Sequence, residues 1–208
     1  MVLRTLLLKP AQPGLTRTLV LLHGYGADEH DLLPVAHELD PRLRAVSLQA
    51  PISLGGRARA WFNLAMGPRG LSYDAGEVRE GVSAAVEAVE AIARETPRPI
   101  LLGFSQGAGM ALSVALRRPD LVSAVLSFSG VLRALDDADL APAASLRGFP
   151  VFAAHGTQDP VVPIALGRGI RAELLRHEMA LEWHEYPMGH MVLPQELDDA
   201  RTWISRHL

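Results

Sequence analysis

Residues 99–116 read PILLGFSQGAGMALSVAL, and this stretch sets the architecture expected for the whole chain. The apolar run Pro99–Leu102 is typical of a buried strand, and the run that begins at Ala108 is typical of a helix. Between them, residues 103–107 match the pattern G-x-S-x-G. A strand that turns at once into a helix needs glycine on both sides of the turning residue, because side chains there would collide with neighbouring backbone. We therefore expect Ser105 on a tight turn, with its hydroxyl exposed above the end of a strand.

The composition narrows the class of protein. The chain has 208 residues, 49% of them hydrophobic, and a formal charge of −3. We expect a single domain over residues 1–208, without the basic surface that a nucleic-acid partner requires. Cysteine is absent, which excludes disulfides, a thiolate nucleophile and cysteine-ligated metal sites. No apolar run reaches the roughly 18 residues of a membrane span or the length of a signal peptide's apolar region, so we expect a cytoplasmic protein without integral membrane association.

Short apolar runs alternate with longer amphipathic runs along the chain. This alternation is typical of an α/β protein with a mostly parallel central sheet and helices on both faces. The expected strands are Val2–Leu8, Thr18–Leu22, Arg44–Leu48, Pro99–Gly103, Ala124–Phe128, Val151–Ala154 and Leu181–Tyr186. The expected helices are Asp28–Glu38, Asp74–Arg94, Ser105–Arg118, Pro163–His177 and Gln195 to the end of the chain. Residues 54–73 have no clear period, and we expect a long irregular loop there.

A serine nucleophile needs a histidine base and a carboxylate that orients the histidine. With this type of turn, the chain order is Ser, then Asp or Glu, then His, each at the carboxyl end of a strand. Asp159 follows the apolar run 151–154 through a short turn, and it is the best candidate for the carboxylate. The other candidates lie further beyond their strand, in a stretch that reads as a solvated helix start: Asp136, Asp137 and Asp139.

Four histidines follow Asp159. His177 and His207 read as surface residues, and His184 lies inside a strand with its side chain toward a helix-packed surface. His190 follows that strand in a loop that can reach back over the sheet, so we assign the base to His190. The earlier His23 and His155 each precede a glycine at a strand end without a second ligand at a recognisable spacing, so we expect them to bond loop backbone and expect no metal.

An acyl-transfer site also needs donors for an oxyanion. The N–H of Gln106 lies at the start of the helix after Ser105, and the N–H of Tyr25 lies in the glycine-bearing turn after strand 18–22.

The segment 54–73 supplies apolar side chains for an acyl-binding groove, although core packing explains each of them equally well. The candidate groove residues are Trp61, Phe62, Leu64, Met66 and Leu71. A phosphate-binding loop is the competing interpretation of Gly103, Gly107 and Gly109, but the lysine and the G-x-G-x-x-G spacing are missing.

With these residues assigned, the chain resembles the phospholipase/carboxylesterase family of α/β-hydrolases, which includes bacterial carboxylesterases and acyl-protein thioesterases. The matching motifs, in chain order, are LHGYG at 22–26, WF at 61–62, GFSQGA at 103–108, HGTQDPVVP at 155–163 and YPMGH at 186–190. One departure is Asn63, where family members often carry aspartate, which leaves the leaving group or the loop geometry open.

The resemblance implies an α/β-hydrolase, and because the expected strands and helices use almost all of the 208 residues, we expect no separate cap domain. The resemblance also implies a triad of Ser105, Asp159 and His190, an oxyanion hole at Tyr25 and Gln106, and cofactor-free hydrolysis of short- to medium-chain acyl esters, thioesters or lysophospholipids, often by a homodimer. Two alternatives stay open: a perhydrolase or acyltransferase that uses the same serine, and a non-catalytic binding protein on this scaffold, which would be expected to lack a triad residue.

Overall fold

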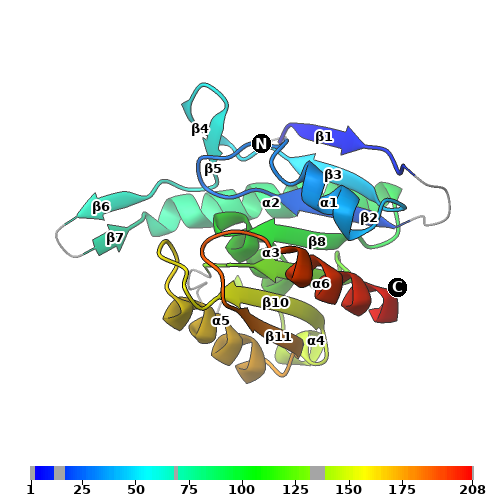
Figure 1. The fold of residues 1–208 in the computed structure, drawn as a ribbon. Helices are drawn as coiled ribbons and strands as arrows, with labels where there is room; N and C mark the ends of the chain where they lie inside the picture. Colours follow the sequence, from blue (N-terminus) through cyan, green and yellow to red (C-terminus); the bar gives the residue numbers. More distant parts are fainter. Residues whose placement is uncertain (1–2, 12–16, 68–69, 132–138, 208) are drawn as a thin grey trace.

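A central sheet of seven strands forms the middle layer of the protein (Figure 1). The computed structural model describes residues 3–11, 17–67, 70–131 and 139–207. The strand order is β1-β3-β2-β8-β9-β10-β11; β1 pairs with β3 in the antiparallel sense, and the other pairs are parallel. The strands are β1 (Thr5–Leu8), β2 (Thr18–Leu22), β3 (Arg44–Leu48), β8 (Ile100–Phe104), β9 (Ala124–Phe128), β10 (Pro150–Gly156) and β11 (Ala180–Tyr186).

The expected mostly parallel sheet is confirmed, and the reason lies in strand composition. The central strands β2 and β9 are buried along their whole length, as a strand covered on both faces must be. All seven expected strands are present, within one or two residues at most ends. The first is shorter than expected, because pairing with β3 begins only at Thr5.

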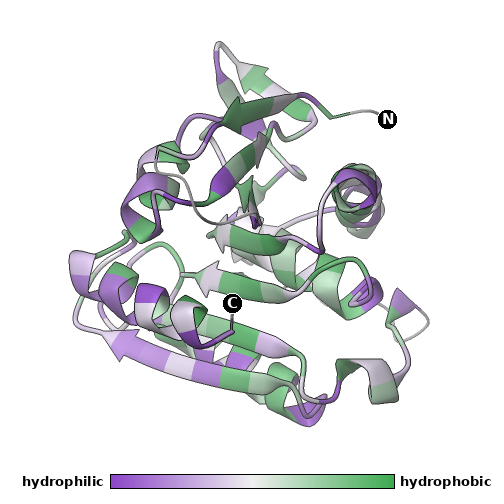
Figure 2. Ribbon diagram, turned by 90° about the vertical axis from the view of Figure 1, so that its right-hand side faces the viewer, coloured by the Kyte–Doolittle hydropathy of each residue, from purple (hydrophilic) through white to green (hydrophobic). Residues whose placement is uncertain are grey.

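Helices cover both faces of the sheet (Figure 1). Helices α1 and α6 pack on one face and on each other, whereas α2, α3 and α5 pack on the opposite face. Two apolar cores result, one on each side, and Figure 2 shows apolar residues concentrated along the inner strands while the helices are striped. The helices are α1 (Leu33–Leu39), α2 (Ala75–Glu95), α3 (Gln106–Arg117), α4 (Ala143–Leu146), α5 (Ile164–Arg176) and α6 (Pro194–His207).

The ends of the long helix α2 follow from its sequence. The side chain of Asp74 accepts a hydrogen bond from the N–H of Glu77, which satisfies one free donor of the first turn. The helix ends at Glu95, two residues before Pro97, because the residue before a proline is disfavoured in helical conformation.

Two expectations are wrong. Residues 54–73 are not one irregular loop, because most of the segment forms two hairpins: β4 (Ile52–Gly55) with β5 (Ala58–Ala60), and β6 (Ala65–Gly67) with β7 (Gly70–Ser72). Helix α1 begins at Leu33 rather than at Asp28, because residues 28–32 form turns in which Asp28 accepts the N–H of His30. Both hairpins lie between β3 and α2 in the sequence, and Figure 1 shows them projecting away from the central sheet.

None of the described helices is both long enough and apolar enough to cross a lipid bilayer.

Candidate active site

Ser105 lies on the turn between β8 and α3, as predicted. Its φ is 54°, in the left-handed region that residues other than glycine rarely adopt. A side chain at Gly103 would collide with the backbone of Gly107 and Ala108, and one at Gly107 would collide with the carbonyl of Leu22. The two glycines therefore allow β8, β2 and α3 to approach closely enough to hold Ser105 in this strained conformation.

The two segments that carry the candidate oxyanion donors adjoin Ser105. Gln106 is the first residue of α3, so its N–H has no acceptor within the helix. The loop after β2 approaches from the other side: a Cβ built on Gly24 would lie 3.5 Å from the Cβ of Ser105. Within this loop the N–H of Gly26 donates to Arg59 O, and the N–H of Ala27 donates to Gly24 O. The structure therefore brings the loop of Tyr25 and the start of α3 together around Ser105.

Asp159 and His190 form a direct pair. Nδ1 of His190 lies 2.7 Å from Oδ2 of Asp159, and the Asp159 side chain is fully buried. The loops that carry them are packed tightly, since Gln158 donates its N–H to Met188 O and a side chain at Gly156 would collide with the same carbonyl. Two loops that are about 30 residues apart in the sequence are thus held in one arrangement.

The electrostatics favour an ionised Asp159. Burial by itself raises the pKa of this carboxyl, but the N–H of Val162, the His190 ring and the N–H of Val161 together outweigh burial, and the pKa lies below its ordinary value. Oδ1 accepts both backbone N–H groups at 2.8 Å, which leaves Oδ2 for the imidazole. A carboxylate held in this way orients a neutral imidazole with its proton on Nδ1 and its Nε2 lone pair directed elsewhere.

Phe104 connects this pair to the serine. The ring of His190 lies against the ring of Phe104 with 4.8 Å between centroids, and Phe104 immediately precedes Ser105. His190 itself is mostly shielded, with 15% of its side chain exposed. The motif indicated only that position 104 tolerates any residue, so the sequence did not identify Phe104 as a neighbour of the base.

The side chain of Gln106 has a structural role that sequence reasoning missed. Its Oε1 accepts the N–H of Trp61 at 2.9 Å and its Nε2 donates to Phe62 O at 2.8 Å. Trp61 in turn donates its indole N–H to His23 O. The segment after β5 is therefore tied to both the start of α3 and the loop after β2. No short-range sequence pattern predicts this contact, because Gln106 lies 44 or 45 residues from the Trp-Phe pair.

The candidate groove residues do not form one exposed wall. Trp61 and Phe62 are almost fully buried, at 0% and 2% exposure, and both belong to the core against α2 and α3. Of the two interpretations that the sequence left open for these residues, the structure supports core packing. Leu64 is half-buried against the same core. Met66 and Leu71 are register partners in the β6–β7 hairpin, and their side chains lie outside the described part of the structure.

The other five histidines weighed in the sequence have partners of their own. As expected, His23 and His155 bond backbone: His23 contacts Gly24 O and accepts the N–H of Ala50, and His155 contacts Val162 O. Burial is the main reason that the pKa of His23 is lowered. His184 stacks on Phe152 below α6, also as expected. His177 is more buried than predicted and pairs with Glu173, whereas His207 stacks on Trp203.

Two rejected carboxylates, Asp136 and Asp137, lie outside the described residues. The third, Asp139, pairs with Arg117 at 3.7 Å, and both side chains are about one quarter exposed. It is therefore occupied with a partner on α3.

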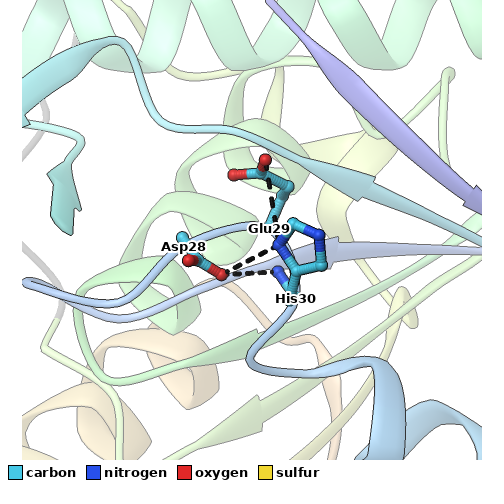
Figure 3. Close-up of side chains that lie close together, drawn as sticks. All are labelled: Asp28, Glu29 and His30. Carbon is cyan, nitrogen blue, oxygen red and sulfur yellow. Dashed lines mark hydrogen bonds and ion pairs between the residues drawn. The ribbon is translucent and has the colours of Figure 1, made fainter. Parts of the chain in front are cut away.

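One cluster of metal-ligand type lies near the loop after β2. Asp28, Glu29 and His30 place one potential ligand atom each within 4.8 Å of one another (Figure 3). Asp28 already accepts the guanidinium of Arg57 at 2.6 Å, and this bond is the main cause that lowers its pKa to about 2. Glu29 accepts the side chain of Gln49. Both carboxylates therefore have partners within the protein, and we assign no metal to this cluster.

Comparison with known proteins identifies the family. A model of the phospholipase/carboxylesterase family matches residues 8–208. The chain belongs to the phospholipase/carboxylesterase family. This family member is 29% identical to acyl-protein thioesterase 1 of Gibberella zeae, over 96% of this chain and 94% of the relative.

Solved structures agree on the fold. The crystal structure of esterase PE8 has a TM-score of 0.85 and 27% identity, with all of both chains covered. The Bacillus cereus carboxylesterase has a TM-score of 0.84 and 24% identity, over 99% of this chain and 95% of its own. The phospholipase/carboxylesterase member described here is therefore a hydrolase with the α/β-hydrolase fold, and the expected family, fold and enzyme class are confirmed.

Proposed function

We propose that this enzyme hydrolyses short- to medium-chain carboxylic esters, with Ser105, Asp159 and His190 as its catalytic triad. The observation that carries the proposal is the 2.7 Å contact between His190 Nδ1 and Asp159 Oδ2, with the His190 ring against the residue that precedes Ser105. Thioesters and lysophospholipids share the same acyl-transfer chemistry and are the other substrates to test. A non-catalytic binding protein is disfavoured, because the chain carries all three residues.

Acylation begins at the Ser105 hydroxyl. Its oxygen attacks the acyl carbonyl while Nε2 of His190 takes the proton, and the ionised Asp159 stabilises the resulting imidazolium. The carbonyl oxygen becomes an oxyanion, which accepts the backbone N–H groups of Tyr25 and Gln106. The tetrahedral intermediate then collapses, the bond to the leaving alcohol or thiol breaks, and His190 gives that group its proton. The acyl group remains as an ester on Ser105.

Deacylation repeats the sequence with water as the nucleophile. His190 takes a proton from the water, whose oxygen attacks the Ser105 ester, and the same two N–H groups stabilise the second oxyanion. Collapse returns the proton to Ser105 Oγ and releases the carboxylic acid. No step calls for a metal or an organic cofactor.

We assign acyl selectivity to the segment that follows β5. Trp61 and Phe62 support this segment from the core, and the prediction that Leu64, Met66 and Leu71 contact the acyl chain remains part of the proposal. The test is the preference for acyl chain length of Trp61→Phe, which keeps a buried ring but loses the bond to His23 O. An unchanged preference would contradict this assignment.

Rapid-mixing kinetics with p-nitrophenyl acetate test the proposal as a whole. The wild type should release a burst of nitrophenol equal to the enzyme concentration, and Ser105→Ala should show no burst.

A panel of esters graded by chain length, run beside a palmitoyl thioester and a lysophospholipid, then defines the substrate. Product analysis with an added alcohol or with hydrogen peroxide identifies an acyltransferase or a perhydrolase. The homodimer that the family resemblance implies is tested by the mass in solution.

A further inference from the structure

Arg59 is fixed against the loop that carries the proposed oxyanion donor Tyr25. Its backbone N–H donates to Ala27 O at 2.9 Å, and its carbonyl accepts the N–H of Gly26 at 2.8 Å. Two residues later, the N–H of Trp61 bonds the side chain of Gln106, which supplies the second proposed donor. Hydrogen bonds of Arg59 and Trp61 therefore tie this segment both to the loop of Tyr25 and to the side chain of Gln106.

The segment that carries Arg59 runs along the loop 23–28. Arg57 reaches Asp28 at one end of this loop, and Trp61 reaches the carbonyl of His23 at the other end. The backbone of Arg59 bonds Gly26 and Ala27 between these two contacts, and the next residue, Ala60, is completely buried. Arg59 is therefore held beside the middle of the loop 23–28.

The guanidinium of Arg59 lacks a carboxylate partner among the described residues. Its Nε is buried without a hydrogen bond. Among the described residues, no other basic side chain has a buried nitrogen that lacks a hydrogen-bond partner. The nearby carboxylates are taken, Asp28 by Arg57 and Glu29 by Gln49. A partly buried cation without a partner is costly, and an anion that binds there would recover that cost.

We infer that Arg59 binds an anionic oxygen group of the substrate, a carboxylate or a phosphate, while the acyl carbonyl occupies the oxyanion hole. This inference rests on the proposed function. The planar guanidinium donates two parallel hydrogen bonds to such a group, which a lysine at the same position would not reproduce. The enzyme would then prefer acyl esters that carry a negative charge near the scissile bond over neutral esters of the same size.

Matched ester pairs test the inference. The probes are 4-nitrophenyl acetate, which is neutral, 4-nitrophenyl hydrogen succinate, which carries a carboxylate on the acyl part, and 4-acetoxyphenyl phosphate, which carries a phosphate on the leaving group. The measured quantity is kcat/KM for each anionic ester relative to the neutral one. Arg59→Gln should lower this ratio about tenfold for the ester whose anion Arg59 binds, and Arg59→Lys should recover only part of it. The ester whose ratio falls shows whether Arg59 binds an anion on the acyl part or on the leaving group.

Arg57→Gln is the matched control, because it removes the same charge two residues away from an arginine that is paired with Asp28. Its ratio should equal that of the wild type. An unchanged ratio in Arg59→Gln, an equal fall in Arg57→Gln, or a parallel loss on all three esters would each overturn the inference.

Thermal unfolding in the presence of succinate or inorganic phosphate separates this inference from the proposed function. The anion that Arg59 binds should raise the Tm of the wild type and of Arg57→Gln, and should raise that of Arg59→Gln much less. This result would support the anion site even if no ester were hydrolysed. Equal shifts in all three proteins, or none, would overturn it.

Discussion

Nδ1 of His190 lies 2.7 Å from Oδ2 of Asp159, whereas the other oxygen of that carboxylate accepts two backbone N–H groups. The carboxylate is therefore fixed by the main chain before it contacts the imidazole. This arrangement assigns a proton to Nδ1 and leaves Nε2 as the basic atom.

Asp159→Asn should remove the preference for a proton on Nδ1 of His190, although the side chain at position 159 keeps nearly the same shape. An amide that keeps its N–H toward the ring would favour the opposite tautomer, and kcat for ester hydrolysis should fall by about ten-thousandfold. Steady-state kinetics on p-nitrophenyl acetate measure the effect. Asp139→Asn, at a carboxylate that the sequence also offered, should keep full activity. A loss of less than tenfold in Asp159→Asn would show that this carboxylate does not orient the base.

Gly107→Ala should destabilise the fold severely. The added methyl group would enter the space of the Leu22 carbonyl, where backbone on both sides leaves no room to relax. We expect the free energy of unfolding to fall by about 3 kcal/mol or more, measured by urea denaturation. Gly169→Ala is the control, because a Cβ there meets nothing within 4 Å and the residue lies inside α5. It should stabilise the protein by about 0.5–1 kcal/mol, and equal effects of the two changes would contradict the account of the turn.

Glu196 should make stability depend on pH. Its side chain is fully buried; Oε2 accepts only the N–H of Leu193, and Oε1 has no partner among the described residues. Burial raises its pKa to about 8, so between the ordinary carboxyl range and pH 8 the folded state holds a proton that the unfolded state has lost. Stability from this group is therefore present at low pH and falls as pH rises through that window.

Urea unfolding at pH 6 and pH 8 measures this effect. The wild type should lose about 2 kcal/mol more than Glu196→Gln across that interval, because the amide does not titrate. Parallel losses in the two proteins would show that Glu196 ionises normally in the folded state.

Gln106→Met should separate the two roles of this residue. The backbone N–H stays, so Ser105 should still react with a fluorophosphonate. The N–H of Trp61 and the carbonyl of Phe62 would lose their buried partners, and the free energy of unfolding should fall by about 2 kcal/mol. Chemical denaturation and labelling of the same sample check both statements. Unchanged stability would indicate that water replaces the amide.

The sheet was predictable because its signals are local. Strands such as Thr18–Leu22 and Ala124–Phe128 are continuous apolar runs between turn residues, and their bounds agree with the sequence analysis. The triad candidates followed from the same signals, because chain order and strand ends restrict the choice. Asp159 and His190 are paired in the structure, although only the fold brings them together.

The contacts that were missed depend on distant parts of the chain. The hairpins within residues 54–73 have short strands, and one of them contains a register shift, so periodicity is too weak to detect them. The Trp-Phe pair suggested a groove wall because aromatic residues in loops often contact ligands. Burial beneath Gln106, 44 or 45 residues away, gives the pair a different structural role. The missing partner of the Arg59 guanidinium likewise depends on the folded surroundings, so no sequence pattern indicates it.

The acyl-enzyme on Ser105 is the central claim, and covalent labelling tests it most directly. The folded enzyme is treated with a fluorophosphonate, and peptide mass spectrometry locates the adduct. We predict one adduct per chain, on Ser105, and none in Ser105→Ala. An adduct on another residue, or undiminished labelling of Ser105→Ala, would contradict the account.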